Sequence, residues 1–169
     1  MGQTAAVDDA DRVQARTAGA ADRGWVEAFL AAHHSARVVS RGRLFHPADL
    51  DGLVAEAPGG DRLALLTWRP DGDDLEVVTL HAAVPGRGAG SALLAAAAAE
   101  ARRRRCRRLW LITTNDNTAA FRWYQRRGMV LAAAHVGAVA GSRRLKPEIP
   151  ETGDDGIPIR DELELELRW

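Results

Sequence analysis

Apolar and polar positions alternate along several short stretches of the chain, which is the spacing of β-strands that bury one face. These stretches cover residues 13–17, 53–57, 63–68, 75–81, 130–136 and 162–167, and residues 109–114 form an apolar run typical of a buried strand. Apolar residues at helical spacing over 22–34, an Ala/Leu-rich stretch over 90–105 and a basic segment over 138–146 predict helices. Residues 147–159 hold three prolines and four acidic residues, so we expect a long acidic loop there.

Short turns join the three strands between residues 53 and 81, which predicts an antiparallel meander. Alternation in its last strand places Glu76 on the face of Val78 and Leu80, and His81 with Thr79 on the opposite face. A buried carboxylate must be ion-paired or have a raised pKa, and either state suits a general base that deprotonates an ammonium group. A solvated charge at the start of the strand is the alternative. His81 is expected to pack or to make a polar contact, although a bulge would reverse these faces.

Glutamate and leucine alternate strictly over residues 162–167, so we expect one buried leucine face and solvated glutamates. Asp22 is expected to cap the helix that follows it, on which Trp25 and Phe29 share a face. Such an aromatic pair belongs either to the core or to a binding pocket.

Composition indicates one globular domain spanning residues 1–169, with small and acidic residues 1–11 expected to be disordered. Lys+Arg and Asp+Glu number 23 each, so net charge favours neither nucleic acid nor an anionic membrane as a partner. The arginine-rich run over 102–108 lacks interleaved aromatics and is expected to form a solvated helix end. A single cysteine, Cys106, and the lack of an apolar run long enough for a leader or a membrane span predict a cytoplasmic protein.

A glycine-rich turn follows the strand over residues 75–81 and leads into the Ala/Leu helix. Gly86, Gly88 and Gly90 allow positive φ angles, so that successive backbone N–H groups and the helix N-terminus converge on one anion, such as a pyrophosphate. The chain has no P-loop string, and it lacks both the third glycine and the acidic residue of a dinucleotide fingerprint. A tight strand-to-helix turn without a ligand is the alternative.

Two blocks resemble the GNAT superfamily of N-acetyltransferases. Residues 85–90, Pro-Gly-Arg-Gly-Ala-Gly, resemble the Arg/Gln-X-X-Gly-X-Gly/Ala loop that binds the acetyl-CoA pyrophosphate, except that Pro85 replaces Arg or Gln. Residues 117–129 resemble the segment Asn-X-X-Ala-X-X-Phe-Tyr-X-X-X-Gly-Phe, with Asn117, Tyr124 and Gly128 in register and with Trp123 and Met129 at the phenylalanine positions. The resemblance spans residues 75–135.

The resemblance implies an α/β fold whose mixed, mostly antiparallel sheet is flanked by helices and splayed between its fourth and fifth strands. It implies an acyltransferase that moves acetyl directly from acetyl-CoA, without a metal, to a primary amine of a small molecule. The backbone at Leu80 and Ala82 would pair with the pantetheine arm, and Asn117 would contact the CoA arm from the other side. The pyrophosphate would lie on the loop residues Gly86, Arg87, Gly88, Ala89, Gly90 and Ser91.

By the same resemblance, the Tyr124 hydroxyl would face the CoA sulfur and protonate the departing thiolate, while Glu76 would act as the base. Trp25 and Arg41 would lie near the acceptor, and the acidic loop would border it and could recognise a cationic group. Two alternatives remain open: a non-catalytic CoA-binding or partner-binding module on this fold, and a protein N-terminal or lysine acetyltransferase. A homodimer is compatible with the sequence.

Overall fold

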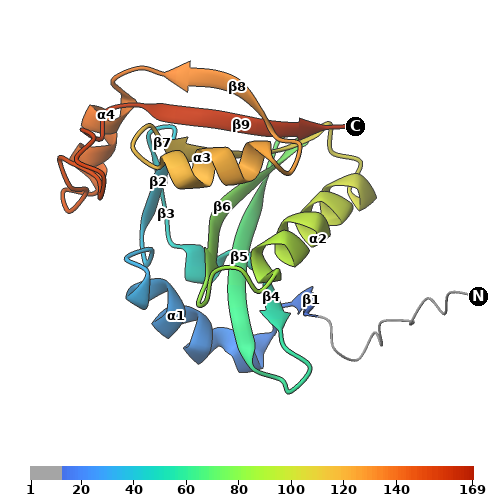
Figure 1. The fold of residues 1–169 in the computed structure, drawn as a ribbon. Coiled ribbons are helices and arrows are strands. Elements are labelled where there is room, and N and C mark those ends of the chain that lie inside the picture. Colours follow the sequence, from blue (N-terminus) through green and yellow to red (C-terminus); the bar gives the residue numbers. More distant parts are fainter. Residues whose placement is uncertain (1–12) are drawn as a thin grey trace, which may run out of the picture.

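A computed structural model describes residues 13–169, so the disorder expected for residues 1–11 lies outside the described part of the chain. Seven strands form one sheet in the order β1-β4-β5-β6-β7-β9-β8 (Figure 1). Their bounds are β1 Gln14–Thr17, β4 Asp51–Glu56, β5 Arg62–Asp71, β6 Asp74–Ala82, β7 Arg108–Thr114, β8 Val130–His135 and β9 Glu162–Arg168. Each lies where the sequence predicts a strand, from alternation for six of them and from an apolar run for β7.

The sheet is mixed and splayed, as expected. All neighbouring strands are antiparallel except β6 and β7, which run parallel and pair only from Leu75 with Leu109 to Val77 with Leu111. Beyond Val77 the two strands separate, at the position of the fourth and fifth strands of the sheet. The α/β fold with its splayed sheet is therefore confirmed.

Helices cover both faces of the sheet. Residues of α2 (Ala89–Arg103) and α3 (Thr118–Gln125) pack into the main core on one face, whose centre includes Leu66, Leu75 and Leu93. On the other face α1 (Arg23–Ala32) buries Val26 and Leu30 against β4 and β5, and α4 (Ala138–Leu145) lies beside β2 and β3. Two short 3-10 turns, η2 (Ala20–Asp22) and η3 (Pro47–Asp49), flank α1 and β4. No helix in the described part of the chain is long and apolar enough to cross a membrane.

A short hairpin lies between α1 and β4, where the sequence analysis predicts no strand. Strands β2 (Val38–Ser40) and β3 (Arg43–Phe45) pair as a separate two-stranded sheet. The tight turn between them holds Arg41 and Gly42 at positive φ angles of 47° and 73°. The hairpin was missed because three-residue strands carry too little alternation to be recognised.

A β-bulge in β6 overturns the expected faces of this strand. Thr67 pairs with Thr79, but the next residue, Trp68, pairs with Val77, so Val78 is an extra residue on β6. The insertion shifts the alternation by one position. Leu80 therefore joins the core beneath α2, and Thr79 and His81 face the same side as Glu76.

The glutamates of β9 are buried, which contradicts the expectation that they are solvated. Glu162, Glu164 and Glu166 are 2%, 5% and 9% exposed. Arg108 lies between the last two carboxylates, with its Nη1 2.8 Å from each, and the Ser142 hydroxyl donates to Glu162. On the other face Leu165 is buried and Leu163 and Leu167 are half-buried, so the strand is covered on both faces, with different chemistry on each.

Asp22 links three elements instead of capping α1. It occupies the N-cap position, but no side-chain capping bond forms. Its carboxylate accepts from Arg16 of β1 at 2.7 and 2.9 Å, from Arg62 of β5 at 2.9 Å and from the Gly19 amide at 2.8 Å. The hydrogen bond from Arg16 is the main cause of a pKa for Asp22 far below its usual range.

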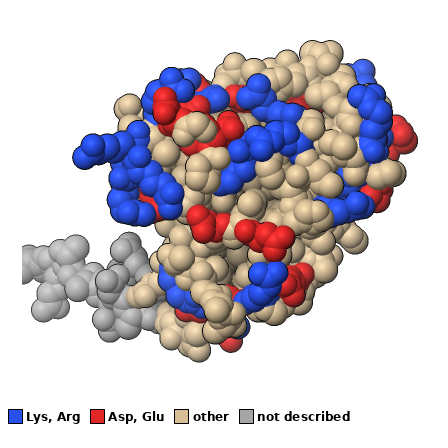
Figure 2. All heavy atoms as spheres, turned by 180° about the vertical axis from the view of Figure 1, so that it is seen from behind, with Lys and Arg blue, Asp and Glu red and all other residues tan. Residues whose placement is uncertain are grey.

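Arginines of the run over residues 102–108 are largely engaged with acids or aromatic rings. Arg103 and Arg104 donate to Glu100, Arg108 donates to Asp74, and Arg102 lies over the Trp169 ring. Figure 2 shows anionic side chains lying among the cationic ones on the face opposite to the view in Figure 1. The run is therefore not a uniform cationic surface.

Candidate functional site

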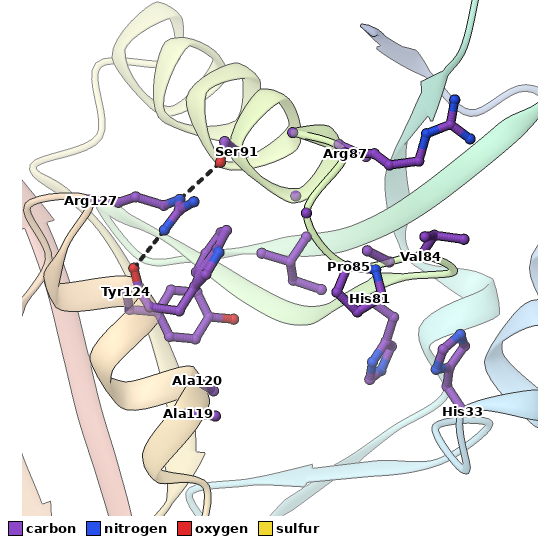
Figure 3. Close-up of a pocket in the computed structure, with 17 residues that line it drawn as sticks. His33, His81, Val84, Pro85, Arg87, Ser91, Ala119, Ala120, Tyr124 and Arg127 are labelled. Carbon is purple, nitrogen blue, oxygen red and sulfur yellow. Dashed lines mark hydrogen bonds between the residues drawn. The ribbon is translucent and has the colours of Figure 1, made fainter.

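A cavity of about 510 Å³ lies where β6 and β7 separate. One wall is residues 80–91 without Ala83, which run from the end of β6 through the glycine loop to the first turn of α2. The opposite wall comes from α3 and includes Trp123 and Tyr124, and His33 at the end of α1 closes one end (Figure 3). The structure thus brings the glycine loop and the segment that begins at Asn117, the two blocks singled out in the sequence, to one cavity.

The glycine loop presents a row of unpaired backbone donors. Gly86 and Gly88 have positive φ angles of 84° and 77°, and nothing lies within 4 Å of where a Cβ of either would be. In the described part of the chain, the N–H groups of residues 86–91 have no hydrogen-bond acceptor. At Gly90 the constraint is steric, because a Cβ there would lie 3.2 Å from the Trp123 ring. The loop is therefore built to hold an anion on its amides.

The end of β6 has an open edge toward the cavity. The Ala83 amide donates to Leu63 of β5 at 2.8 Å, so the alternation of a strand turns the peptide groups of Leu80 and Ala82 away from β5. The strand β7 pairs with β6 only up to Val77 and leaves these groups free. An extended ligand could add to the sheet here as a further strand.

Tyr124 faces the cavity from α3. Figure 3 shows its hydroxyl pointing into the cavity, toward the side on which His81 and His33 lie. Its ring meets the Trp123 ring edge-on at 5.0 Å. Burial raises the pKa of the phenol well above its usual value, so the hydroxyl stays protonated and can only donate its proton or accept a hydrogen bond.

Two histidines that the sequence analysis did not assign to the site, His33 and His81, line the cavity. The His33 and His81 rings stack at 4.8 Å with an interplanar angle of 11°. Along α1 the stack continues from His33 to Phe29 and Trp25, with centroid distances of 4.5 and 4.7 Å. Burial, and then the neighbouring His33, lower the pKa of His81 to about 4, so His81 is neutral at pH 7. The sequence does place His33, or Ala32, on the helix face of Trp25 and Phe29 by helical spacing, but this spacing alone did not indicate a role for His33 in the site.

Glu76 is fully buried and does not line the cavity. The Ser40 hydroxyl donates to its Oε1 at 2.5 Å, and Arg69 lies 2.6 Å from its Oε2. Burial raises the pKa of the carboxyl, although Ser40 and Arg69 oppose this effect. The expectation that a carboxylate on this face is paired or has a raised pKa is met on both counts, while its role as a base stays a prediction.

Three other residues expected at the site lie outside the cavity lining. Trp25 stacks on Phe29, at the far end of the row that leads to His33. The Arg41 amide donates to Glu162 at 3.0 Å, and its guanidinium lies 5.7 Å from the centre of the Trp110 ring. Asn117 caps α3, with its Oδ1 accepting from the Ala120 amide at 3.1 Å. Their contacts with a ligand stay predictions.

A second cavity of about 720 Å³ continues from the first along α3 and shares Ser91, Ala119, Trp123 and Arg127 with it. Arg122 and Arg126 complete its lining. Arg127 is held in place, because it donates to the Ser91 hydroxyl at 2.9 Å and lies 3.7 Å from the centre of the Trp123 ring. This end of the site is cationic and suits an anionic group.

Two loops beyond His33, the α1–β2 connection and the start of the acidic loop after α4, are joined by hydrogen bonds and an ion pair. Lys146 Nζ donates to the carbonyl oxygens of His34 at 2.9 Å and of Arg37 at 2.8 Å. Arg37 also pairs with Glu148, at the start of the acidic loop. Asp154 and Asp155 of that loop are exposed. Within residues 13–169, no group of three His, Cys, Asp or Glu side chains is placed to hold a metal ion.

Comparison with known proteins gives one consistent result. The family described as Acetyltransferase (GNAT) family matches residues 21–129. The uncharacterized protein YdhI of Bacillus subtilis is 41% identical over 120 residues, which cover 71% of this chain and 75% of that protein.

Solved structures share the fold at low sequence identity. A Bacillus subtilis acetyltransferase in complex with CoA has a TM-score of 0.68 at 14% identity and covers 94% of this chain and 99% of its own. A GNAT family acetyltransferase from Elizabethkingia anophelis with acetyl-CoA bound has a TM-score of 0.66 at 16% identity, with coverage of 94% and 99%. Together with the match over residues 21–129, these results show that the chain belongs to the GNAT family of acetyltransferases.

Proposed function

We propose that this protein transfers an acetyl group from acetyl-CoA directly to a primary amine of a small molecule. The observation that carries the proposal is one continuous cavity that joins the free amides of residues 86–91, the open edge of β6 and the Tyr124 hydroxyl. These are the three contacts that a long thioester with a pyrophosphate at one end would require.

The residues present fit acetyl-CoA along its length. The amides of the glycine loop and the N-terminus of α2 would hold the pyrophosphate, so that the loss of an Arg or Gln side chain at Pro85 removes only one contact. Leu80 and Ala82 would pair with the amides of the pantetheine arm. Arg122 and Arg126 of the second cavity would meet the phosphate on the ribose.

Bound acetyl-CoA supplies a thioester carbonyl that an amine can attack, and the chain's own residues would manage the protons. The Tyr124 hydroxyl would donate to the departing sulfur, since a phenol of pKa about 10 or above is protonated at neutral pH while the thiolate needs a proton. Glu76 is one candidate for the base. Because its carboxylate has no exposed surface, it would act through an intervening group such as Ser40.

A small acceptor is favoured over a segment of another protein. The ties from Lys146 to the α1–β2 connection, together with the pair of Arg37 and Glu148, join the loops beyond His33. An extended peptide that approached from this side would have to separate them. The exposed carboxylates of Asp154 and Asp155 could bind a second cationic group of the acceptor.

We also propose that two copies pair through β8. This strand is at the edge of the sheet, and Val130 and Leu131 are 57% and 48% exposed. Residues 130–134 carry no charge that would keep a second strand away. An edge strand pairs antiparallel with its own copy about a two-fold axis, so the occupant that fits this edge is a second copy of the chain.

The test of the enzymatic function is release of CoA thiol from acetyl-CoA with a panel of primary amines, including amino-acid derivatives, polyamines and aminoglycosides, and with peptides that present a free N-terminus or lysine. We expect release with at least one small amine and none with the peptides. Tight binding of acetyl-CoA without release for any acceptor would favour the non-catalytic module. Release with the peptides alone would favour a protein acetyltransferase.

A further inference from the structure

We propose that His81 is the catalytic residue that takes the proton from the acceptor nitrogen, and that His33 and Ser35 position its ring. This inference rests on the proposed acetyltransferase function and names the base for that reaction. Its starting observation is that His81 lines the same cavity as Tyr124, whereas Glu76 does not.

The bulge at Val78 places His81 in the site. Without the extra residue, alternation from Glu76 would put His81 on the opposite face, in the core beneath α2. With it, His81 lies next to the end of α1, and Tyr124 lies across the cavity on α3 (Figure 3). A thioester between these walls would have its carbonyl close to one side chain that can accept a proton and one that can donate a proton.

The hydrogen bond with Ser35 is the basis for assigning which nitrogen of His81 is basic. The Ser35 hydroxyl lies 3.1 Å from the His33 carbonyl oxygen, which can only accept, and 2.8 Å from His81 Nε2. We assign the one hydroxyl hydrogen to the carbonyl, so that the Ser35 oxygen accepts from an Nε2–H of His81. Nδ1 then carries the lone pair, and it has no hydrogen-bond partner among the described residues. Ser35 is 8% exposed, so this contact is sheltered from water.

The surroundings keep His81 neutral. His33 from α1 stacks on the His81 ring. The other titratable side chains that line the cavity are Tyr124, Arg87 and Arg127, of which Arg87 extends away from His81 (Figure 3), and the carboxylate on the same strand face, Glu76, is paired with Arg69. None of these is a free anion that would stabilise an imidazolium, and burial lowers the pKa of His81 to about 4. Such a weak base cannot remove a proton from a free ammonium ion, but it can take one from the nitrogen after attack, when that N–H is far more acidic.

The step balances as follows. The neutral amine nitrogen bonds to the thioester carbon, and the carbonyl π electrons move to oxygen. His81 Nδ1 takes one proton from the nitrogen; the electron pair on oxygen then re-forms the carbonyl, the carbon–sulfur bond breaks, and the sulfur takes the Tyr124 proton. The products are the amide and CoA thiol, and the proton on His81 returns to the Tyr124 phenolate through solvent.

The tautomer can be tested without any acceptor. Long-range ¹H–¹⁵N correlation spectra of the CoA-bound protein, recorded from pH 4.5 to 8, should show His81 as the Nε2–H form and neutral throughout most of this range. Ser35→Ala should mix the two tautomers while the fold is kept. An Nδ1–H form, or titration of His81 near the ordinary histidine value of about 6.5, would overturn the proposal.

Kinetics test the role in the reaction, with hydroxylamine as a small probe nucleophile and thiol release as the readout. We expect His81→Gln to lower kcat/KM by about 10²-fold, the scale of lost general-base assistance, and to leave the calorimetric Kd for acetyl-CoA within about threefold. His46→Gln is the matched control, since His46 is exposed and lies outside the cavity. Full activity of a folded His81→Gln variant overturns the role, as does a loss seen in Glu76→Gln alone.

Failure of this inference differs from failure of the proposed function. If wild-type protein binds no acetyl-CoA, the proposed function falls, and the role of His81 falls with it. If wild-type protein releases thiol and His81→Gln does so equally fast, only the role of His81 is lost.

Discussion

At the scale of single residues, the site contains two titratable groups, Tyr124 and His81, whose pKa values are shifted by burial in opposite directions away from neutral pH. Burial raises the pKa of the Tyr124 phenol and lowers that of the His81 imidazole to about 4. Between these two values the tyrosine is protonated and the histidine is not. A proton donor and a proton acceptor thus coexist in one cavity over the whole physiological range.

Tyr124→Phe tests the donor. The variant keeps the ring and its contact with Trp123 and removes only the hydroxyl, so the fold and the affinity for acetyl-CoA should be nearly unchanged. We expect kcat to fall about 10²-fold, because the departing thiolate loses its proton donor. Stopped-flow thiol release with the acceptor found in the amine panel measures this. A folded variant that turns over at the wild-type rate would make Tyr124 a packing residue.

At the scale of elements, Gly86 and Gly88 have positive φ angles in the loop that leads into α2, and this conformation exposes the backbone amides at the start of the helix. Gly88→Asp should abolish binding of acetyl-CoA, because it adds a negative charge and a strained conformation at the amides proposed for the pyrophosphate. Isothermal titration calorimetry measures the affinity.

Gly137→Asp is the matched control for this change. Gly137 is also the N-cap of a helix, α4, at a φ angle of 74°, so the same substitution brings similar strain at a site away from the cavity. Its affinity for acetyl-CoA should equal that of the wild type. An unchanged affinity in folded Gly88→Asp protein would move the pyrophosphate away from this loop.

The elements of the sheet could be predicted from the sequence, but which way their side chains face could not. Alternation gives the strands and the glycine block gives the loop, because both are local properties of the chain. The bulge at Val78 depends on the register between β5 and β6, which alternation in one strand does not contain. The burial of Glu164 likewise depends on Arg108, 56 residues away. His81 was missed because the bulge reverses the face on which it lies. The β9 glutamates were predicted to be solvated because their partner Arg108 is distant in the sequence.

At the scale of the whole molecule, Asp22 joins β1, α1 and β5 near one end of the sheet. Asp22→Asn should lower the free energy of unfolding at pH 7 by roughly 2–3 kcal/mol, less than the usual cost of breaking a buried pair because Arg16 and Arg62 reach solvent. Since the folded pKa of Asp22 is depressed, its contribution is complete above the unfolded pKa of about 3.9 and is lost as pH falls below it. Urea unfolding should show the gap between wild type and variant beginning to narrow below about pH 4 and continuing to narrow as pH falls toward the depressed folded pKa. A gap independent of pH would mean that packing, not charge, explains the loss.

The proposed pairing through β8 can be measured as a molar mass in solution. We expect light scattering coupled to gel filtration to give twice the chain mass of 18.3 kDa. Leu131 is 48% exposed, and Leu131→Lys, which puts a charge on this edge strand, should give a monomer that keeps the native circular-dichroism spectrum. A wild-type monomer at tens of micromolar would exclude this pairing as a stable assembly.

Within residues 13–169, the ladder between β6 and β7 consists of three residue pairs. If acetyl-CoA binds between β6 and β7 beyond these pairs as an added strand, its binding also stabilises the fold. Ligand at a hundred times its Kd would then add about 2.7 kcal/mol to the free energy of unfolding. The chain's resistance to heat and to proteases would then rise and fall with the concentration of acetyl-CoA.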